Sequence, residues 1–439
     1  MQGEWAESAD TTEGRVKHRR TEKPGGRLPE PERVRVVFDQ DLRARTRDAV
    51  HGLRLIAAGH HIPPPLDDSP KCPRCALVGI CLPDEVNYLT RGEVSPRPLA
   101  VGRDDALPLY VRAQRARIGK EAETLKIEVE DEPATTARLI DVSQLVLVGN
   151  VSITTPALHE LMRRDIPVSW YSSGGWFIGH TGGTGHRNVE LRTAQYRASF
   201  DPTQCLALAR GLVAAKLRNG RTLLRRNWRD GDAPAGLLDD LKRQAEHALR
   251  VGNLAALLGI EGSGGAVYFR HLPGVLKRGA DEPAFDFATR NRRPPTDPVN
   301  ALLSFAYAML TRAFTVTLSA VGFDPYRGFY HQPRYGRPAL ALDLMEPFRP
   351  LIADSAVIQA VNNGEVQAND FVSTGPAVAL KPDGRKRFIA AFERRLSHEI
   401  THPLFGYRVS YRRLIEVQAR LLGRWLLGEI PEYPQFVTR

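Results

Sequence analysis

The change of hydrophobic pattern near residue 200 constrains the fold of this chain more than any other feature. Before it, residues 109–111, 124–129 and 145–148 form short apolar stretches separated by polar turns, which is typical of β-strands. After it, apolar residues recur three and four positions apart, as in helices packed on a core. The segments with this spacing are residues 205–228, 235–258, 298–316 and 388–427. We therefore expect a multidomain protein in which a β-rich domain precedes a large all-α domain.

Local signals place one helix and one hairpin in the β-rich part. Thr155 and Pro156 open a helix, Thr155 as the N-cap and Pro156 in the first turn. Residues 167–171 and 176–178 flank Ser172-Ser173-Gly174-Gly175, which is typical of a hairpin connection.

The chain that precedes this domain is short and mixed. Residues 33–38 alternate like a strand, residues 42–58 have helical spacing, and the prolines at 63–65 end that helix. Residues 83–107 are loop-like. The expected parts are a mixed α/β segment over residues 1–90, a linker over 91–107, the β-rich domain over 108–197 and the helical domain over 198–439.

The charge balance favours a polyanionic partner. The chain has 439 residues, with 61 Lys plus Arg against 50 Asp plus Glu, a formal charge of +11. Binding to a nucleic acid releases counterions for each phosphate that a basic residue neutralises. No apolar run approaches the roughly 20 residues that span a bilayer, and the first residues lack the pattern of a secretory signal. We therefore expect a cytoplasmic protein without a membrane partner.

Glu261 interrupts an apolar helix that is rich in small residues, between Ile260 and Gly262. Burial of an unpaired carboxylate costs several kcal/mol, so the position indicates a cation, a hydrogen-bond partner or a raised pKa. The neighbouring glycines would let a second backbone or a nucleic acid strand approach closely. An exposed glutamate on a helix surface remains the structural alternative.

A histidine and two further acids complete the chemistry of the helical part. His331 lies among aromatic residues before a loop, and Asp343 and Glu346 are three positions apart, on one face of a helix that Pro347 must kink or end. Each of them alone is more often structural. Together with Glu261 they offer oxygen-rich ligation with one nitrogen, which suits Mg²⁺ or Mn²⁺. Such a cation can activate a hydroxyl for attack on a phosphodiester.

The segments Leu-Gly-Ile-Glu261-Gly, Asp-Pro-Val-Asn300-Ala-Leu-Leu, Gly-Phe-Tyr-His331 and Ala-Leu-Asp343-Leu-Met-Glu346-Pro-Phe-Arg-Pro resemble the CRISPR adaptation integrase from about residue 109 to about residue 430. The resemblance implies an N-terminal β domain, a C-terminal helical domain and catalytic metal ligands at Glu261, His331 and Glu346. Asp343 matches a further acid near the site and is a possible ligand.

The same resemblance implies an activity and its partners. The family joins the 3′-hydroxyl ends of captured double-stranded DNA to a CRISPR repeat by transesterification. It works as a homodimer with a small ferredoxin-fold protein of CRISPR adaptation. Asn300, Ser304 and Tyr307 could line the cleft, or could form an ordinary polar helix face. The residues predicted to contact DNA are Lys216, Arg218 and Arg221 on a helix edge, Asn300, Arg349, and Lys381 and Arg385 in a basic loop.

The cysteines Cys72, Cys75 and Cys81 form a cluster that indicates metal or iron–sulfur ligation in a cytoplasmic chain. The cluster, with the Gly-x-x-x-His pattern of residues 14–18, resembles the iron–sulfur RecB-like CRISPR exonuclease, which is often fused to this integrase. Two departures are serious. No cysteine precedes Cys72, which counts against an intact [4Fe–4S] cluster, although Cys205 could in principle complete the set. The chain between His18 and Arg33 is also too short for the nuclease sheet. We therefore expect a truncated remnant without exonuclease activity.

Two alternatives stay open from the residues. The same metal site could hydrolyse branched DNA, with water in place of the 3′-hydroxyl. The chain could also be a non-catalytic adaptor that binds DNA within the adaptation complex.

Overall fold

The computed structural model describes residues 37–59, 63–75, 77–92, 94–99, 106–113, 115–174, 177–183, 188–229, 231–277, 285–291 and 293–438. The chain separates into two compact units, one that ends at Pro64 and one that begins at Pro65. The predicted Gly-x-x-x-His segment and residues 33–36 of the predicted strand lie outside the described residues.

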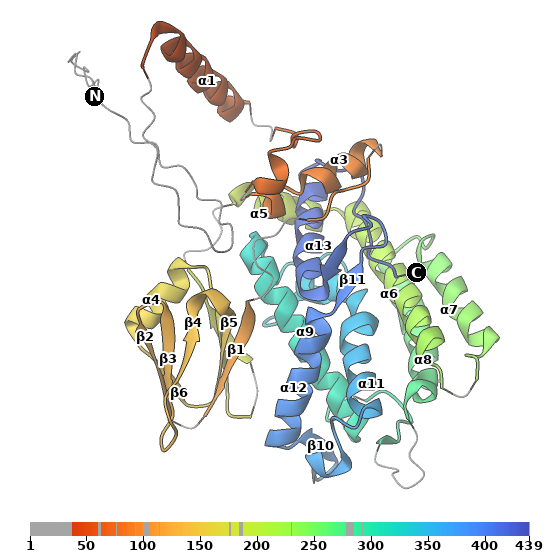
Figure 1. Cartoon of the computed structure of the whole chain (residues 1–439). Helices are drawn as coiled ribbons and strands as arrows, with labels where there is room; N and C mark the ends of the chain where they lie inside the picture. Colours follow the sequence, from red (N-terminus) through yellow and green to blue (C-terminus); the bar gives the residue numbers. More distant parts are fainter. Residues whose placement is uncertain are drawn as a thin grey trace. The chain divides into compact units, whose positions relative to one another are not determined.

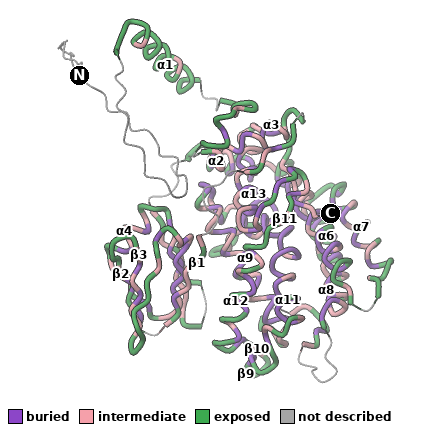
Figure 2. Tube along the Cα trace, viewed as in Figure 1, coloured by how far each residue is buried: buried purple, intermediate pink, exposed green. Residues whose placement is uncertain are grey.

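In the first unit, the predicted helix is present as α1 (Gln40–Ala58). Asp39 caps it by accepting a hydrogen bond from the backbone N–H of Leu42 at 2.8 Å. Three of its apolar side chains, Leu53, Leu55 and Ile56, are more than half exposed, and most of the helix is exposed (Figure 2). This helix therefore buries no residue within its own unit.

The cysteine segment belongs to the second unit and packs on its helical part. It contains a short 3₁₀ turn, Cys72–Arg74, followed by α2 (Val78–Cys81) and α3 (Pro83–Arg91). Leu82 and Val86 join the hydrophobic core of the helical domain. The buried carboxylate of Glu85 accepts a hydrogen bond of 2.8 Å from the hydroxyl of Tyr407.

The predicted β-rich domain is present as two four-stranded sheets and one helix (Figure 1). One sheet has the order β1 (Leu107–Arg112), β5 (Val142–Val148), β7 (Val168–Tyr171) and β8 (Phe177–Thr181). The other has the order β4 (Thr135–Arg138), β3 (Thr124–Glu128), β2 (Ala116–Glu121) and β6 (Val151–Ile153). Helix α4 (Thr155–Arg163) contacts β2. The predicted hairpin is the antiparallel pair β7–β8.

The predicted all-α domain follows and holds the larger core (Figure 1). Its long helices are α5 (Val189–Phe200), α6 (Pro202–Asn227), α7 (Ala235–Ala248), α8 (Leu254–His271), α9 (Pro298–Val321), α12 (Pro382–Ser397) and α13 (Tyr411–Leu426). The shorter elements are α10 (Ala339–Met345), α11 (Ser355–Asn362), and the hairpins β9 (Phe371–Thr374) with β10 (Ala377–Leu380) and β11 (Glu399–Thr401) with β12 (Arg408–Ser410). The predicted order of domains is confirmed.

Helix α9 is long and apolar enough to cross a membrane by length and composition, which the sequence reading overlooked. Its 18-residue apolar window is 56% buried inside the protein. Residues such as Leu302, Leu310 and Phe314 are fully buried in the helical core. The core helix of a globular domain passes the same test, and α9 has that position here.

Several predicted boundaries are wrong for local reasons. The helix predicted over residues 235–258 is two helices, because the chain turns at Gly252 and Asn253 caps α8 through the N–H of Ala256. The segment 388–427 is interrupted by the β11–β12 hairpin. The basic loop is instead the start of α12, with Pro382 at its first position. The N-cap of α4 is Thr154 rather than Thr155.

Candidate active site

The position of Glu261 follows from the close packing of α8 on α6. A Cβ atom at Gly264 would overlap the side chain of Leu217, so glycine allows the two helices to approach. Glu261 lies one turn earlier on α8, with its side chain 14% exposed. Its Oε2 accepts a hydrogen bond of 2.6 Å from the hydroxyl of Tyr330. The glutamate is therefore an internal residue, and the surface alternative is wrong.

Glu346 approaches Glu261 from the end of α10. It is the C-cap residue of that helix, and Pro347 prevents the helix from continuing. Its carboxylate is fully buried, and neither oxygen receives a well-oriented hydrogen bond. The Nη2 atom of Arg349 lies 3.0 Å from Oε1, and the Nζ atom of Lys216 lies 2.8 Å from Oε2.

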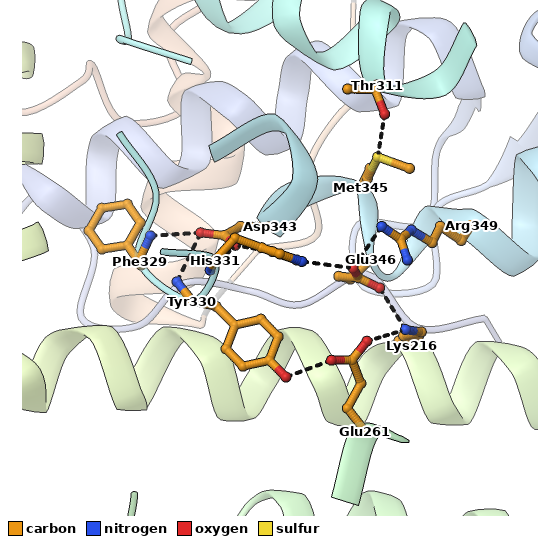
Figure 3. Close-up of polar contacts among 10 residues, drawn as sticks. All are labelled: Lys216, Glu261, Thr311, Phe329, Tyr330, His331, Asp343, Met345, Glu346 and Arg349. Atoms are coloured by element: carbon orange, nitrogen blue, oxygen red, sulfur yellow. Dashed lines mark hydrogen bonds and ion pairs between the residues drawn. The ribbon is translucent and has the colours of Figure 1, made fainter. Parts of the chain in front are cut away.

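Lys216 joins the two glutamates, as Figure 3 shows. Its ammonium also forms an ion pair with Oε1 of Glu261, so one cation contacts both carboxylates. The side chain is 17% exposed. The sequence reading placed Lys216 on a basic helix edge, and that placement is wrong, because this face of α6 points toward α8 rather than toward solvent.

Asp343 holds the segment that carries His331. Its Oδ2 accepts hydrogen bonds from the backbone N–H groups of Phe329 and Tyr330, at 2.7 and 3.0 Å. Its Oδ1 accepts from the backbone N–H of His331 at 2.8 Å and lies 2.7 Å from the imidazole Nδ1. All four contacts use the two oxygens that a metal would need. The structure therefore gives Asp343 a positioning role in place of ligation.

This arrangement turns the other imidazole nitrogen toward the glutamates. With Nδ1 facing Asp343, the Nε2 atom of His331 lies 3.8 Å from Oε1 of Glu346. A carboxylate on one ring nitrogen fixes the proton there and leaves the second nitrogen as an acceptor. Glu346 therefore links the three predicted residues, because it shares Lys216 with Glu261 and also faces the imidazole of His331 (Figure 3).

The electrostatics of the cluster depend on burial and on paired charge. Burial alone would raise the pKa of Glu261, but the charge of Lys216 and the hydrogen bonds from Lys216 and Tyr330 lower it to about 2. Burial would lower the pKa of Lys216, but Glu346 and Glu261 raise it above its usual value. The carboxylate and the ammonium are therefore both charged at neutral pH.

The cluster lies in the wall of a cavity of about 1010 Å³. Glu261, Gly262 and Gly265 of α8 line one side, and a Cβ atom at either glycine would meet nothing within 4 Å. The arginines that line the cavity are Arg270, Arg290, Arg334, Arg337 and Arg349. A cavity with carboxylates and several arginines can bind a phosphodiester strand beside the acids.

Arg290 is a cavity residue that the sequence reading missed. Its guanidinium donates to Oδ1 of Asn300 at 2.7 Å and to Oγ of Ser304 at 3.2 Å, and it lies 5.5 Å from the ring centre of Tyr307. Asn300 is fully buried and does not line the cavity, so its predicted contact with DNA is wrong. The arginine-rich run at residues 290–293 was the signal that could have found Arg290.

A buried acid, Asp354, also lines the cavity. Asp354 accepts hydrogen bonds from the hydroxyls of Tyr268, at 2.8 Å, and Tyr307, at 2.7 Å. Burial raises its pKa to about 6, although both hydroxyls and the charge of Arg349 oppose that shift. No sequence signal marked this residue.

The other predicted DNA contacts lie outside the cluster. Arg218 is exposed on α6, and Arg221 donates to the carbonyl of Leu238 at 2.9 Å. Lys381 and Arg385 donate to the carbonyls of Asn369 and Leu380, respectively. Their contact with DNA stays a prediction.

The three clustered cysteines carry free thiols, and among the described residues they do not form a group that could hold a metal ion. Burial raises the pKa of Cys81, and the neighbouring thiols of Cys72 and Cys75 add to the effect. The backbone N–H of Leu77 donates to the sulfur of Cys75 at 3.4 Å. The thiol of Cys205 contacts the carbonyls of residues 198 and 199 instead, so it packs within the helical domain.

Among the described residues, no three His, Cys, Asp or Glu side chains are already arranged to hold a metal ion. The types of donor atom at Glu261, His331 and Glu346 nevertheless fit a divalent cation. Two carboxylates and an imidazole converge, and the buried oxygens of Glu346 lack oriented hydrogen bonds. Hard oxygen donors with one nitrogen suit Mg²⁺ or Mn²⁺.

Comparison with known proteins identifies the family. Residues 109–394 match the family model described as CRISPR associated protein Cas1. A protein of Geobacter sulfurreducens named CRISPR-associated exonuclease Cas4/endonuclease Cas1 fusion is 59% identical over 413 residues, which cover 93% of this chain and 74% of that protein. The CRISPR-associated endonuclease Cas1 3 of Thermus thermophilus is 38% identical over 333 residues, which cover 75% of this chain and 97% of that protein.

Solved structures share the fold. A Cas1 protein from Thermotoga maritima superposes with a TM-score of 0.63 at 23% identity, covering 73% of this chain and 97% of the other. A casposase bound to its integration product superposes with a TM-score of 0.65 at 22% identity, covering 75% of this chain and 94% of the other. These structures, the family match and the identities to the fusion proteins agree. The chain therefore belongs to the Cas1 family of CRISPR-associated proteins and carries a Cas4-like N-terminal region.

Proposed function

We propose that this chain is a metal-dependent DNA integrase of CRISPR spacer acquisition, which joins the 3′-hydroxyl ends of captured DNA to the CRISPR repeat by transesterification. The observation that carries the proposal is the convergence of Glu261, Glu346 and His331 in the wall of an arginine-lined cavity. The names of the relatives, which include an endonuclease, support it.

Glu261, Glu346 and His331 would hold Mg²⁺ or Mn²⁺. When bound, the cation would supply positive charge to the scissile phosphate and lower the pKa of the attacking hydroxyl. Asp343 holds His331 so that Nε2 faces Glu346. The hydroxyl of Tyr330 orients the carboxylate of Glu261.

The cavity wall would position the DNA. Arg349 and Arg290 both stack on the ring of Tyr307, with their Cζ atoms 5.2 and 5.5 Å from its centre. Stacked guanidinium groups are restrained and present planar donors to phosphate oxygens. The open glycine face of α8 at Gly262 and Gly265 leaves room for the strand. Phosphate contacts of this kind position DNA without reading its sequence.

The partners are part of the same proposal. We expect double-stranded DNA, a second copy of the chain, and a small ferredoxin-fold protein of CRISPR adaptation. One solved neighbour, with a TM-score of 0.61, is a Cas6-RT-Cas1–Cas2 complex, which is 22% identical to this chain. We propose that the Cas4-like segment has no exonuclease activity, because the sequence between His18 and Arg33 is too short for the catalytic sheet of that nuclease.

The test is strand transfer of a labelled 3′-hydroxyl duplex into a leader–repeat duplex with Mn²⁺. We expect Glu261→Gln and His331→Gln to abolish the joined product. Glu399→Gln, at an exposed glutamate that pairs with Arg408, is the matched control and should retain activity. Unchanged product with Glu261→Gln would refute the site. Cleaved product without joining would favour hydrolysis of branched DNA, and DNA binding without either product would favour an adaptor.

A further inference from the structure

Lys216 has a position that the proposed chemistry does not explain. It lies in the middle of α6, and its ammonium contacts one oxygen of Glu261 and one of Glu346. The remaining oxygens of the two carboxylates have other neighbours: the hydroxyl of Tyr330 for Glu261, and the guanidinium of Arg349 for Glu346. Oε1 of Glu261 and Oε2 of Glu346 therefore share one cation, the ammonium of Lys216.

We infer that Lys216 is an internal cation that holds Glu261 and Glu346 together before a divalent cation binds, and that it competes with that cation for both carboxylates. The inference rests on the proposed metal site. Two buried carboxylates repel each other when no cation lies between them. Lys216 removes that repulsion, and a divalent cation that binds both glutamates must displace its ammonium.

The lysine side chain suits this exchange better than arginine would. Lysine is a compact point charge with three donors on a flexible stem of four carbons, whereas a guanidinium is a planar fork. Arg349, which pairs with Glu346 and lies over the ring of Tyr307, is restrained by comparison. Lys216 is also one of the residues that line the cavity in which we propose that DNA lies.

Displacement of Lys216 would couple the binding of the divalent cation to the binding of DNA. When Lys216 leaves the glutamates, its ammonium needs another anion, because an unpaired buried charge is costly. A DNA phosphate in the cavity offers one. DNA should therefore draw Lys216 away from the glutamates and tighten the binding of the divalent cation, and the two ligands should favour each other to the same extent.

The experiment measures Mn²⁺ affinity by electron paramagnetic resonance of the free ion, with and without a 3′-hydroxyl DNA duplex. The full chain is compared with Lys216→Met and with Lys242→Met, which removes an exposed lysine on the neighbouring helix α7. Without DNA, Lys216→Met should bind Mn²⁺ at least about tenfold more tightly than the unsubstituted full chain, which lies within the usual range of coupled binding. DNA should tighten Mn²⁺ binding to the full chain and to Lys242→Met, and have less effect on Lys216→Met.

The outcomes separate this inference from the proposed metal site. Equal or weaker Mn²⁺ affinity in Lys216→Met, with Mn²⁺ binding lost in Glu261→Gln, overturns the inference alone. Mn²⁺ binding that Glu261→Gln does not change overturns both. If Lys216→Met does not fold, Lys216→Gln keeps a polar group without the charge and should show the same tighter binding. If neither variant folds, the full chain decides, because DNA that leaves its Mn²⁺ affinity unchanged overturns the inference.

Discussion

Replacement of Asp343 by asparagine tests how the fold prepares His331. The four contacts of Asp343 divide evenly between its oxygens, with the N–H groups of Phe329 and Tyr330 on Oδ2 and two donors of His331 on Oδ1. Asparagine has one oxygen, so one of these pairs must face its NH₂ group. The two backbone N–H groups on Oδ2 cannot become acceptors, whereas the imidazole can move its proton to the other nitrogen. We therefore expect the NH₂ group to face His331.

The expected cost follows from that geometry. Only the backbone N–H of His331 loses its acceptor, and a hydrogen bond to a charged group contributes about 1.5–3 kcal/mol. The free energy of unfolding should therefore fall by about 2 kcal/mol. The proton moves from Nδ1 to Nε2, the nitrogen that faces Glu346, so the imidazole can no longer donate a lone pair there. Loss of such a supporting partner lowers metal affinity or activity by about 10- to 100-fold.

The assay combines urea denaturation, Mn²⁺ titration and the ¹⁵N shifts of labelled histidine, with His331→Gln used to assign the signal. Asp370→Asn is the matched control, since Asp370 is also buried in the helical domain and accepts hydrogen bonds from Gln367 and Arg387. It should lose stability without a change in the His331 tautomer or in Mn²⁺ affinity. An Asp343→Asn protein that keeps the Nδ1 proton and the original Mn²⁺ affinity would refute the reasoning.

Three further changes have defined outcomes. Burial raises the pKa of Asp354 from 3.8 to about 6, so the protonated carboxyl stabilises the fold fully below about pH 4, and this contribution is lost as the pH rises through about 6. Above pH 6, Asp354→Asn should therefore be more stable than the original chain by up to about 3 kcal/mol. Urea denaturation from pH 4 to 8 measures the difference. Gly328→Ala places a Cβ atom 2.7 Å from Oδ2 of Asp343 and should destabilise the chain by about 1–3 kcal/mol, whereas Gly259→Ala, with nothing within 4 Å, should not, as thermal denaturation would show. Tyr407→Phe removes the hydroxyl that donates to buried Glu85 and should cost about 1–3 kcal/mol, with faster proteolysis of residues 65–99 as the readout and unchanged proteolysis as the contrary result.

The sequence predicted the parts of the fold that depend on periodicity and short-range signals. Hydrophobic spacing located the helices of the second half. The turn residues at 172–175 predicted the hairpin whose strands are β7 and β8. The break between α7 and α8 was missed because apolar residues recur on both sides of Asn253. A cap that depends on one side chain is a weaker signal than the periodicity on both sides of it.

In the candidate site, the sequence did not predict which residues contact and support the three proposed metal ligands. Glu261, His331 and Glu346 could be grouped from the resemblance, but their supporting residues could not be ranked. Asp343 was expected beside the metal, and its actual contacts depend on how residues 328–331 fold back over α10, which no local pattern encodes. Asp354 could not be predicted, because its role depends on hydrogen bonds from two tyrosine hydroxyls that are distant in the sequence.

Lys216 shows why charge patterns in a sequence are ambiguous. In the sequence, Lys216, Arg218 and Arg221 form one basic cluster, yet the structure gives them separate environments. A helix turns by about 100° per residue, so residues two positions apart point to nearly opposite sides. Lys216 therefore faces the glutamates of the site, while Arg218 faces solvent. The cation that matters most to the two carboxylates was counted among surface charges because sequence distance does not separate the inner face of α6 from its outer face. The same geometry makes Lys216→Met a test of the site, and Arg218→Met a test of the surface that is expected to leave Mn²⁺ affinity unchanged.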